Sequence, residues 1–344
     1  MTLAEILLSP FSLLYGAATH LRARAYRRGI LKPRRLTGTV ISVGNLTVGG
    51  TGKTPMVLWI AERMASEGKS VGILTRGYRG RPSAARKGTD ASSSGSTSDE
   101  VRMMQTRLGE RVAFGVGPDR YANGTALAKR GVDYFVLDDG FQHLQLARDV
   151  NIVLIDAANP FGGGRLLPAG RLREARSALA RADIVVITRS SHAPAIEAAI
   201  RRETEAPICY ARPQLDAIRN FNEGQPGGNV APAALGKLFA FCAIGNPAAF
   251  LADLRAWGLE IVGHKFFPDH HRFTDQDDQS LLREASAAGA AGLICTEKDL
   301  YNLHAIHRAQ MPIFYCAISM RIDREAEFWS RLLALAGSRN DPKS

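Results

Sequence analysis

The stretch 39–69 limits most strongly what this chain can fold into, because it joins a β-branched run to a glycine-rich turn and a helix-like segment. The run reads TVISV, the turn reads GNLTVGGTGKTP, and the segment after it reads MVLWIAERMASEGK. Strand, glycine-rich loop and helix in this order form the context in which a loop ending in Gly-Lys-Thr binds nucleotide phosphates. Glycines let backbone N–H groups approach phosphate oxygens, and the N-terminus of the following helix attracts the anion.

Within this loop the residue types predict separate roles. Lys53 is expected to reach the β- and γ-phosphates of a bound nucleotide, and Thr54 is expected to ligate Mg²⁺. The predicted nucleotide-binding residues are Thr47, Val48, Gly49, Gly50, Thr51, Gly52, Lys53 and Thr54. Thr47 stands where the pattern G-x-x-x-x-G-K-T usually has its first glycine. An ordinary glycine-rich turn is the alternative, but Gly-Lys-Thr between a strand and a helix argues against it.

Short apolar runs alternate with helix-like segments after the loop. The runs VGILT, RVAFG, YFVLDD, NIVLID and IVVITR are of the buried-strand type. This alternation predicts an α/β fold with a doubly wound parallel sheet of the P-loop NTPase type. A second series, from KLFAFCAIG to PIFYCAI, predicts a second, smaller α/β domain. The predicted organisation is an N-terminal apolar and basic segment 1–35, a P-loop domain 36–211, a linker 212–234 rich in Pro, Gly and Asn, and the smaller domain 235–344.

The chain is basic, and its N-terminal region shows where part of that charge gathers. The sequence has 44 Lys and Arg against 33 Asp and Glu, a formal net charge of +11, which suits nucleic acid, an anionic membrane or a phosphorylated substrate. Residues Leu3–Tyr15 are mostly apolar, but the run is short and holds Pro10, so a membrane span is less well supported than a segment lying on the surface, and the sequence does not decide between them. A basic cluster follows, made of Arg22, Arg24, Arg27, Arg28, Lys32, Arg34 and Arg35. This order predicts a helix lying on an anionic membrane surface; the alternative is a helix packed on the body of the protein.

Two adjacent carboxylates end the apolar run YFVLDD. In an open α/β sheet, ligands bind beyond the carboxyl ends of the strands, so Asp138 and Asp139 are expected near the phosphate-binding loop. A carboxylate at this place commonly holds Mg²⁺, directly or through water, and either residue could do so. The alternative is a plain turn, since Asp-Asp-Gly favours turns.

The loop FGGGRLLPAGRLRE carries several candidate ligands. Arg165, Arg171 and Arg173 could each bind phosphate in a forked geometry, and Glu174 could add a carboxylate to a metal site. A solvated loop without a ligand is equally compatible with this composition. Further along, His270 and His271 lie in PDHHRF, just before a helix-like segment. A histidine paired with a carboxylate could orient or deprotonate a hydroxyl, whereas zinc is disfavoured by the lack of further ligands at suitable spacing; a polar turn is the plain alternative.

Six motifs in one order carry a resemblance to a known family. GNLTVGGTGKTP, RGYRG, DDGFQH, LLPAGRLRE, PDHHRF and TEKD span most of the chain. Together with the apolar and then basic N-terminus they resemble the tetraacyldisaccharide 4′-kinases of lipid A biosynthesis. The resemblance implies transfer of the ATP γ-phosphate to the 4′-hydroxyl of a tetraacyldisaccharide 1-phosphate, with Mg²⁺. It also implies peripheral or monotopic attachment at the cytoplasmic face of a Gram-negative inner membrane.

The resemblance further implies roles for residues in the matching motifs. The implied catalytic residues are Asp99, His270, Lys53 and Asp139; the implied metal ligands are Thr54, Asp138 and Glu174; the implied substrate-binding residues are Arg76, Tyr78, Arg120, Gln142, His143 and Arg171. In the family, Asp99 and His270 match a pair that activates the sugar hydroxyl. The family usually has Gly-Asp-Glu-Pro around this Asp, where this chain has Ser98-Asp99-Glu100-Val101, so Glu100 is the alternative base.

The implied partners are a lipid A disaccharide precursor and the anionic surface of the inner membrane, with neither nucleic acid nor an obligate protein partner. A membrane-associated P-loop positioning or partitioning ATPase is the main alternative. Those proteins have a signature lysine just before the Gly-Gly pair, where this chain has Val48. This alternative also does not account for the motif PDHHRF in the second domain. A nucleic-acid-binding NTPase is supported only by the positive charge, because the sequence lacks the mixed aromatic and basic surface that such binding uses.

Overall fold

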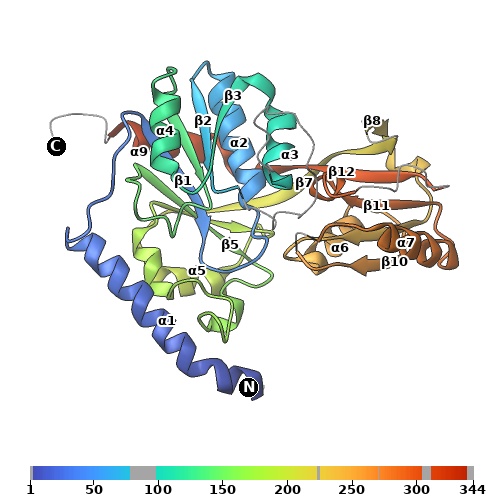
Figure 1. Cartoon of the computed structure of the whole chain (residues 1–344), viewed down its shortest axis with the longest axis horizontal. Helices are drawn as coiled ribbons and strands as arrows, with labels where there is room; N and C mark the ends of the chain where they lie inside the picture. The colour runs from blue at the N-terminus through green and yellow to red at the C-terminus, as the bar shows by residue number, and fades with distance from the viewer. Residues whose placement is uncertain (1–2, 78–97, 223–224, 270, 304–310, 339–344) are drawn as a thin grey trace, which may run out of the picture. The chain divides into compact units, whose positions relative to one another are not determined.

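The computed structural model describes residues 3–77, 98–222, 225–269, 271–303 and 311–338 (Figure 1). The chain forms two compact units. Unit 1 comprises Met1–Arg76, Leu108–Pro213 and Met320–Ser344, and unit 2 comprises Gly77–Arg107 and Gln214–Ser319. The chain changes unit four times, and two of these changes lie within the long strands β7 (Ile208–Asn222) and β12 (Ile313–Ile322).

The sheet of unit 1 is parallel, and it confirms the predicted doubly wound α/β fold. Its strands are β1 (Thr39–Asn45), β2 (Val71–Thr75), β3 (Val112–Val116), β4 (Tyr134–Asp138), β5 (Val150–Asp156), β6 (Ile184–Thr188) and the start of β7. Their order is β7-β6-β5-β1-β4-β2-β3. Every residue of β1 and β5 is buried, as expected for central parallel strands covered on both faces. Strand β1 is flanked by β4 and β5, so its carboxyl end, where the glycine-rich loop begins, lies inside the sheet.

Helices pack on the strands of this sheet through apolar faces. The α-helices of unit 1 are α1 (Leu3–Arg27), α2 (Lys53–Ser66), α4 (Arg120–Ala128), α5 (Pro194–Arg201) and α9 (Glu325–Ser338), and its 3₁₀ turns are η1 (Gly109–Arg111), η2 (Gly162–Gly164) and η3 (Arg176–Arg181). In α2, Met56, Ile60 and Met64 recur every four residues and are fully buried. Helix α2 packs on β1, β2 and β4, and α9 packs on β1 and β5.

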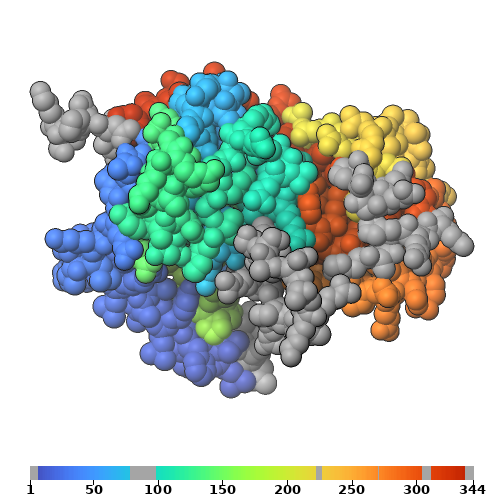
Figure 2. Space-filling view, turned by 45° about the horizontal axis from the view of Figure 1, so that its top comes forward, coloured from blue at the N-terminus to red at the C-terminus, as the bar shows by residue number. Residues whose placement is uncertain are grey.

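Helix α1 is docked by a few contacts and exposes most of its apolar side chains. The Ser12 hydroxyl donates to the carbonyl of Leu166 at 3.0 Å and accepts from the amide of Ala169 at 3.0 Å. The large apolar side chains that it exposes are Leu7, Leu8, Phe11, Leu13, Leu14 and Leu21. The helix lies at the surface in the space-filling view (Figure 2). Among the described residues, no helix has the combined length and apolarity that a membrane crossing needs.

Unit 2 is a smaller α/β unit with its own core. Its strands β9 (Leu238–Cys242), β10 (Ile261–Phe266) and β11 (Gly292–Thr296) are parallel, in the order β10-β9-β11-β12, and β8 (Gln225–Val230) pairs with β7. Its helices are α3 (Asp99–Leu108), α6 (Pro247–Ala256), α7 (Asp275–Ala287) and α8 (Glu297–Leu300), with the 3₁₀ turn η4 (Pro232–Ala234). Alternation along β9 sends Phe239 and Phe241 to the cluster that holds α7, and Leu238 and Ala240 to the cluster that holds α6.

The compact units differ from the predicted boundaries in three places. The expected linker 212–234 is largely strand, because β7 and β8 form an antiparallel pair in which Ile218 faces Val230. The C-terminal helix α9 belongs to unit 1 rather than to the smaller domain, since Phe328 and Trp329 pack edge-on against Trp59 of α2. The described residues 98–107, predicted to belong to the P-loop domain, group with unit 2.

Candidate functional site

The predicted order of strand, glycine-rich loop and helix is present in unit 1. Strand β1 ends at Asn45 and helix α2 begins at Lys53. Gly49 and Gly52 have φ angles of 118° and 87°, which favour glycine. A Cβ at Gly52 would also lie 3.0 Å from Cε of Met320, so this glycine is required both for the turn and for the close approach.

Thr47 replaces a glycine here because its backbone does not need one. Thr47 forms an isolated antiparallel bridge with Leu172, and the Val48 amide donates to the Arg171 carbonyl at 2.8 Å. The Arg173 amide donates to the Leu46 carbonyl at 2.7 Å. An extended backbone suits a β-branched residue, which accounts for the departure from the usual pattern. The segment 171–173 therefore lies alongside the first half of the loop and fixes it.

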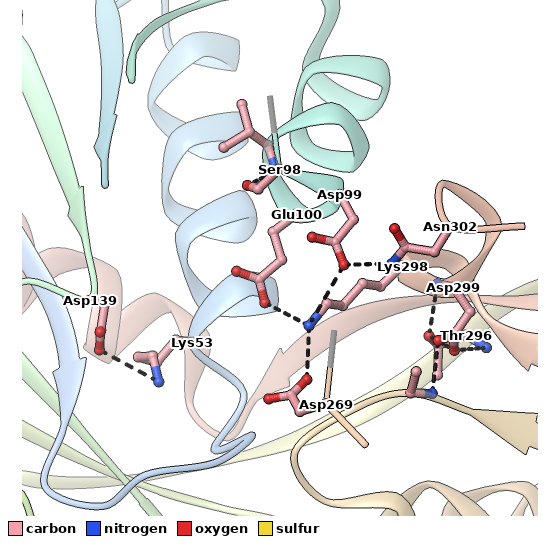
Figure 3. Close-up of polar contacts among 12 residues, drawn as sticks. Lys53, Ser98, Asp99, Glu100, Asp139, Asp269, Thr296, Lys298, Asp299 and Asn302 are labelled. Carbon is pink, nitrogen blue, oxygen red and sulfur yellow. Dashed lines mark hydrogen bonds and ion pairs between the residues drawn. The ribbon is translucent and has the colours of Figure 1, made fainter. Parts of the chain in front are cut away.

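Lys53 lies among polar groups at the start of α2. Its Nζ donates to Oδ1 of Asn45 at 3.2 Å and is 3.6 Å from Oδ1 of Asp139 (Figure 3). The Arg173 guanidinium donates to both carboxylate oxygens of Asp139, at 2.8 and 2.7 Å. Desolvation alone would raise the pKa of Asp139, but Lys53, Arg173 and Arg120 outweigh it and hold this pKa below its usual range. Two cations thus converge on one ionised carboxylate at the end of β4, beside the loop.

Asp138 and Asp139 lie next to each other but face different partners. Asp138 is the last residue of β4, and its Oδ2 accepts from the Thr75 hydroxyl at 3.0 Å. Asp139 has a φ of +48°, a conformation uncommon for a residue with a Cβ. The buried Arg120 donates to the Asp139 carbonyl at 3.4 Å. Burial lowers the pKa of Arg120, and Asp138 and Asp139 partly offset that effect.

The remaining predicted residues of unit 1 fall into two groups. Arg171 donates to the Val48 carbonyl through Nε at 3.3 Å and Nη2 at 3.0 Å, and Gln142 donates to the Asn45 carbonyl at 3.0 Å, so both contact the loop or the strand before it. In the second group, Arg181 donates to both Glu174 oxygens at 2.9 Å. Arg76 is exposed just after β2, and Tyr78 lies outside the described residues.

His143 follows Gln142 in a half-buried position. Burial lowers its pKa to about 4, and the nearby guanidinium groups of Arg120, Arg148 and Arg22 act in the same direction. The imidazole is therefore neutral near pH 7. A neutral imidazole can donate or accept a hydrogen bond, so His143 can contact a ligand as a neutral polar group but not as a cation.

In unit 2, Asp99 begins helix α3 and its side chain is only 7% exposed. Asn302 donates to Oδ2 of Asp99 at 3.0 Å, and Nζ of Lys298 is 4.0 Å from the same oxygen (Figure 3). Glu100 also contacts Lys298, at 3.2 Å. His270, the expected partner of Asp99, lies outside the described residues. The neighbouring His271 contacts Asp277 at 3.0 Å, at the start of α7.

The residues expected to bind a metal ion are Thr54, Asp138 and Glu174. Across the described ranges, no group of three or more His, Cys, Asp or Glu side chains is placed to hold a metal ion. Mg²⁺, however, is usually held by one or two protein oxygens together with water and substrate phosphates. Thr54 and Asp138 supply oxygens of this kind, whereas the structure engages Glu174 with Arg181.

Neither Asn45 nor Lys298 was predicted from the sequence, and Arg173 was predicted only as one of three candidate phosphate ligands. Asn45 is bonded to Lys53, Arg173 clamps Asp139, and Lys298 contacts Asp99 and Glu100. The sequence offered Arg165, Arg171 and Arg173 as phosphate ligands, and only the structure shows that Arg173 is the one that binds Asp139. Lys298 lies in the motif TEKD, which could have marked it as a candidate functional residue. Its partners, however, are distant in the sequence, so no local pattern predicts them.

Comparison with known proteins agrees with this arrangement. The sequence matches the family described as LpxK, Tetraacyldisaccharide-1-P 4'-kinase, over residues 4–336. A tetraacyldisaccharide 4'-kinase of Anaeromyxobacter sp. (strain Fw109-5) is 40% identical over 336 residues, covering 93% of this chain and 88% of the relative. Another, of Geobacter sulfurreducens, is 42% identical over 319 residues, covering 90% of this chain and 87% of the relative.

A solved structure is similar as well. The crystal structure of LpxK from Aquifex aeolicus in complex with ATP is 29% identical, with a TM-score of 0.70, and the match covers 96% of this chain and 99% of that chain. These matches extend over both units, which supports a kinase over a positioning ATPase built on the loop alone. The chain therefore belongs to the LpxK family of tetraacyldisaccharide-1-P 4′-kinases, which are ATP-dependent phosphotransferases.

Proposed function

We propose that this chain transfers the γ-phosphate of ATP to the 4′-hydroxyl of a tetraacyldisaccharide 1-phosphate, with Mg²⁺, at the cytoplasmic face of the inner membrane. The hydroxyl oxygen forms a bond to the γ-phosphorus, the bond to the β,γ-bridging oxygen breaks, and ADP leaves. The observation that carries the proposal is the convergence of Lys53 and Arg173 on Asp139 beside the glycine-rich loop. Cations held in this way are already ordered for the charge that develops on a transferred phosphoryl group.

The loop and Lys53 would bind the phosphates of ATP. The left-handed conformations of Gly49 and Gly52 turn the backbone so that its N–H groups can face an anion. Lys53 is already held near the loop by Asn45 and Asp139, so little side-chain freedom remains to be lost when a phosphate binds. Arg173 neutralises Asp139, which keeps that carboxylate from repelling an incoming phosphate.

Thr54 and Asp138 would hold Mg²⁺. The hydroxyl of Thr75 fixes one oxygen of Asp138, which leaves the carboxylate oriented at the carboxyl end of β4. When bound, Mg²⁺ would neutralise part of the negative charge of the phosphates. Glu174 remains a predicted ligand, although its bond to Arg181 would have to open for direct contact.

Asp99 would accept the proton of the acceptor hydroxyl, with His270 as its partner. A sugar hydroxyl is a weak nucleophile at neutral pH, and a positioned carboxylate assists it by taking the proton as the new P–O bond forms. The hydrogen bond from Asn302 supports this role, because it fixes the orientation of the Asp99 carboxylate.

Helix α1 would place the enzyme on the membrane that holds its lipid substrate. Its exposed leucines and phenylalanine can enter the interface between headgroups and acyl chains, and the arginines after them can contact anionic headgroups. The helix is held to unit 1 through Ser12, so membrane binding would keep that unit at the surface.

A transfer assay with γ-labelled ATP tests the proposal. The intact protein is incubated with Mg²⁺ and a tetraacyldisaccharide 1-phosphate in mixed micelles, and the products are separated and analysed for the phosphorylated position. Label on the 4′-oxygen of the glycolipid is the expected result. Release of free phosphate at the same rate with and without the lipid would instead indicate an ATPase and would overturn the proposal.

A further inference from the structure

A buried lysine in unit 2 contacts three carboxylates that come from separate parts of the chain. Lys298 lies on α8, and its side chain is 12% exposed. Its Nζ is 3.2 Å from Oε1 of Glu100, 3.2 Å from Oδ1 of Asp269 and 4.0 Å from Oδ2 of Asp99 (Figure 3). Asp99 and Glu100 begin α3, whereas Asp269 directly precedes His270 in the motif PDHHRF.

The backbone that carries Lys298 is firmly fixed. Thr296 and Asp299 form a reciprocal capping box at the start of α8. Asp299 is fully buried, and its Oδ1 accepts from the Ala243 amide at 2.9 Å, which ties the helix to the chain just after β9. Lys298 lies on this one-turn helix, and its side chain points towards Asp99 at the start of α3 and towards Asp269 (Figure 3).

The charge balance around Lys298 keeps its ammonium group protonated. Burial alone would lower the pKa of Lys298, but Glu100, Asp99 and Asp269 outweigh burial and raise it. Lys298 on α8 is a charged group near Asp99, and its ammonium group also contacts Glu100 on α3 and Asp269. Asn302 is a neutral donor to the same oxygen of Asp99.

We propose that Lys298 is a positioning residue for phosphoryl transfer, which holds the Asp99 carboxylate in place and ties Asp269 to the start of α3. The inference rests on the proposed role of Asp99 as the base. A positive charge within a few ångströms favours the carboxylate form, which is the form that accepts a proton. Its contact with Asp269 also links the two chain segments that supply the proposed catalytic pair.

The test compares Lys298→Met, which removes the charge while keeping most of the length, with Lys298→Arg, which keeps the charge. Lys265→Met is the matched control, because Lys265 also lies in unit 2 and pairs with Ser280 and Glu284 away from Asp99. For each protein, kcat is measured from pH 5 to 9 with saturating ATP and lipid. ATP affinity and the thermal midpoint are measured alongside.

Lys298→Met is expected to lower kcat by about tenfold to a hundredfold, because small displacements of a reacting group are costly. The acid limb of its pH profile should move up by about one unit or more, since the charge that favoured the ionised carboxylate is gone. Lys298→Arg should recover most of kcat with the acid limb in its original place. ATP affinity should change little in either variant, and Lys265→Met should behave as the wild type does.

A double-variant experiment separates this inference from the role of Asp99 itself. In an Asp99→Asn background, Lys298→Met should cost little more, because Lys298 acts through Asp99. A wild-type profile for Lys298→Met beside an impaired Asp99→Asn would overturn the inference and leave the proposed base standing. A silent Asp99→Asn would overturn both. An equal loss from Lys298→Met in both backgrounds would mean that Lys298 acts elsewhere.

If Lys298→Met does not fold, Asn302→Leu carries the test, since Asn302 donates to the same oxygen of Asp99. Its kcat should fall while ATP affinity is retained. An unchanged kcat would show that contacts to Oδ2 of Asp99 do not position this carboxylate for catalysis, and the inference would fail.

Discussion

At the scale of single residues, unit 1 holds one carboxylate with unusual surroundings beside the glycine-rich loop. Asp139 combines a positive φ with hydrogen bonds from Nη1 of Arg173 to both of its carboxylate oxygens and an ion pair with Lys53. An aspartate tolerates this backbone region better than most residues. The ion pairs place two cations beside the glycine-rich loop.

Lys53→Ala should lower kcat by about 10²–10³-fold or more, because it removes a fixed charge that stabilises the transferred phosphoryl group. The measurement is the initial rate of lipid phosphorylation at saturating ATP. Lys69→Ala is the control, since Lys69 pairs with the nearby Glu67 beyond the end of α2. Near-normal transfer by Lys53→Ala would contradict the assignment of the loop.

His143 should make unit 1 sensitive to acid. Its folded-state pKa of about 4 lies below the ordinary value of 6.5, so the unfolded chain binds more protons between these values. The free energy of unfolding should therefore fall as the pH drops from about 6.5 towards 4. His143→Gln should lose less stability over this window than the wild type does.

Urea unfolding at pH 7 and at pH 5 measures the effect, with His192→Gln as the control at an exposed position of the same unit. The difference between wild type and His143→Gln should change between the two pH values, whereas the difference for His192→Gln should stay constant. Parallel behaviour of both variants would show that His143 is not the group responsible.

At the scale of elements, α1 shows how a helix can be attached to a protein and still offer an apolar face to another surface. Its polar contact through Ser12 is narrow, and Gly16 lies so close to Leu166 that an added Cβ would be 2.6 Å from that side chain. Leu13 and Leu14, by contrast, are 75% and 70% exposed.

A Leu13→Asp, Leu14→Asp double variant should bind anionic vesicles at least tenfold more weakly, because burying a leucine contributes about 1.5–3 kcal/mol. Sedimentation with vesicles of phosphatidylglycerol and phosphatidylethanolamine measures binding. Added salt should weaken the wild type too, since each basic residue near the surface contributes about 1 kcal/mol. Val116→Asp, a change at an exposed apolar residue of β3, is the control. Equal binding by all three proteins would rule out α1 as the membrane contact.

At the scale of the whole molecule, unit 1 is completed by the last part of the chain. Helix α9 returns to pack on β1 and β5, and Phe328 and Trp329 meet Trp59 of α2 at centroid distances of 5.7 and 5.6 Å. The residues that carry the glycine-rich loop are therefore supported by a helix that follows unit 2 in the sequence.

Trp329→Ala should lower the free energy of unfolding by about 3–5 kcal/mol, as expected when a buried aromatic side chain leaves a cavity. Arg331→Ala on the same helix is the control and should cost less than about 0.5 kcal/mol, because surface substitutions usually do. Denaturant unfolding of both variants gives the comparison. If the two cost the same, α9 does not stabilise unit 1.

The sequence alone determined the features that depend on neighbouring residues. The alternation of apolar runs and helix-like segments predicted the parallel α/β sheet, and the glycines before Lys53 predicted the loop between β1 and α2, because strand period, helix period and turn chemistry are all local. Only the tertiary structure decided which of three arginines clamps Asp139, and that α9 belongs with the first unit. It also placed Lys298 beside Asp99, although almost two hundred residues separate them in the sequence. Such pairings form only when distant segments pack together in the folded chain, so no periodicity in the sequence predicts them.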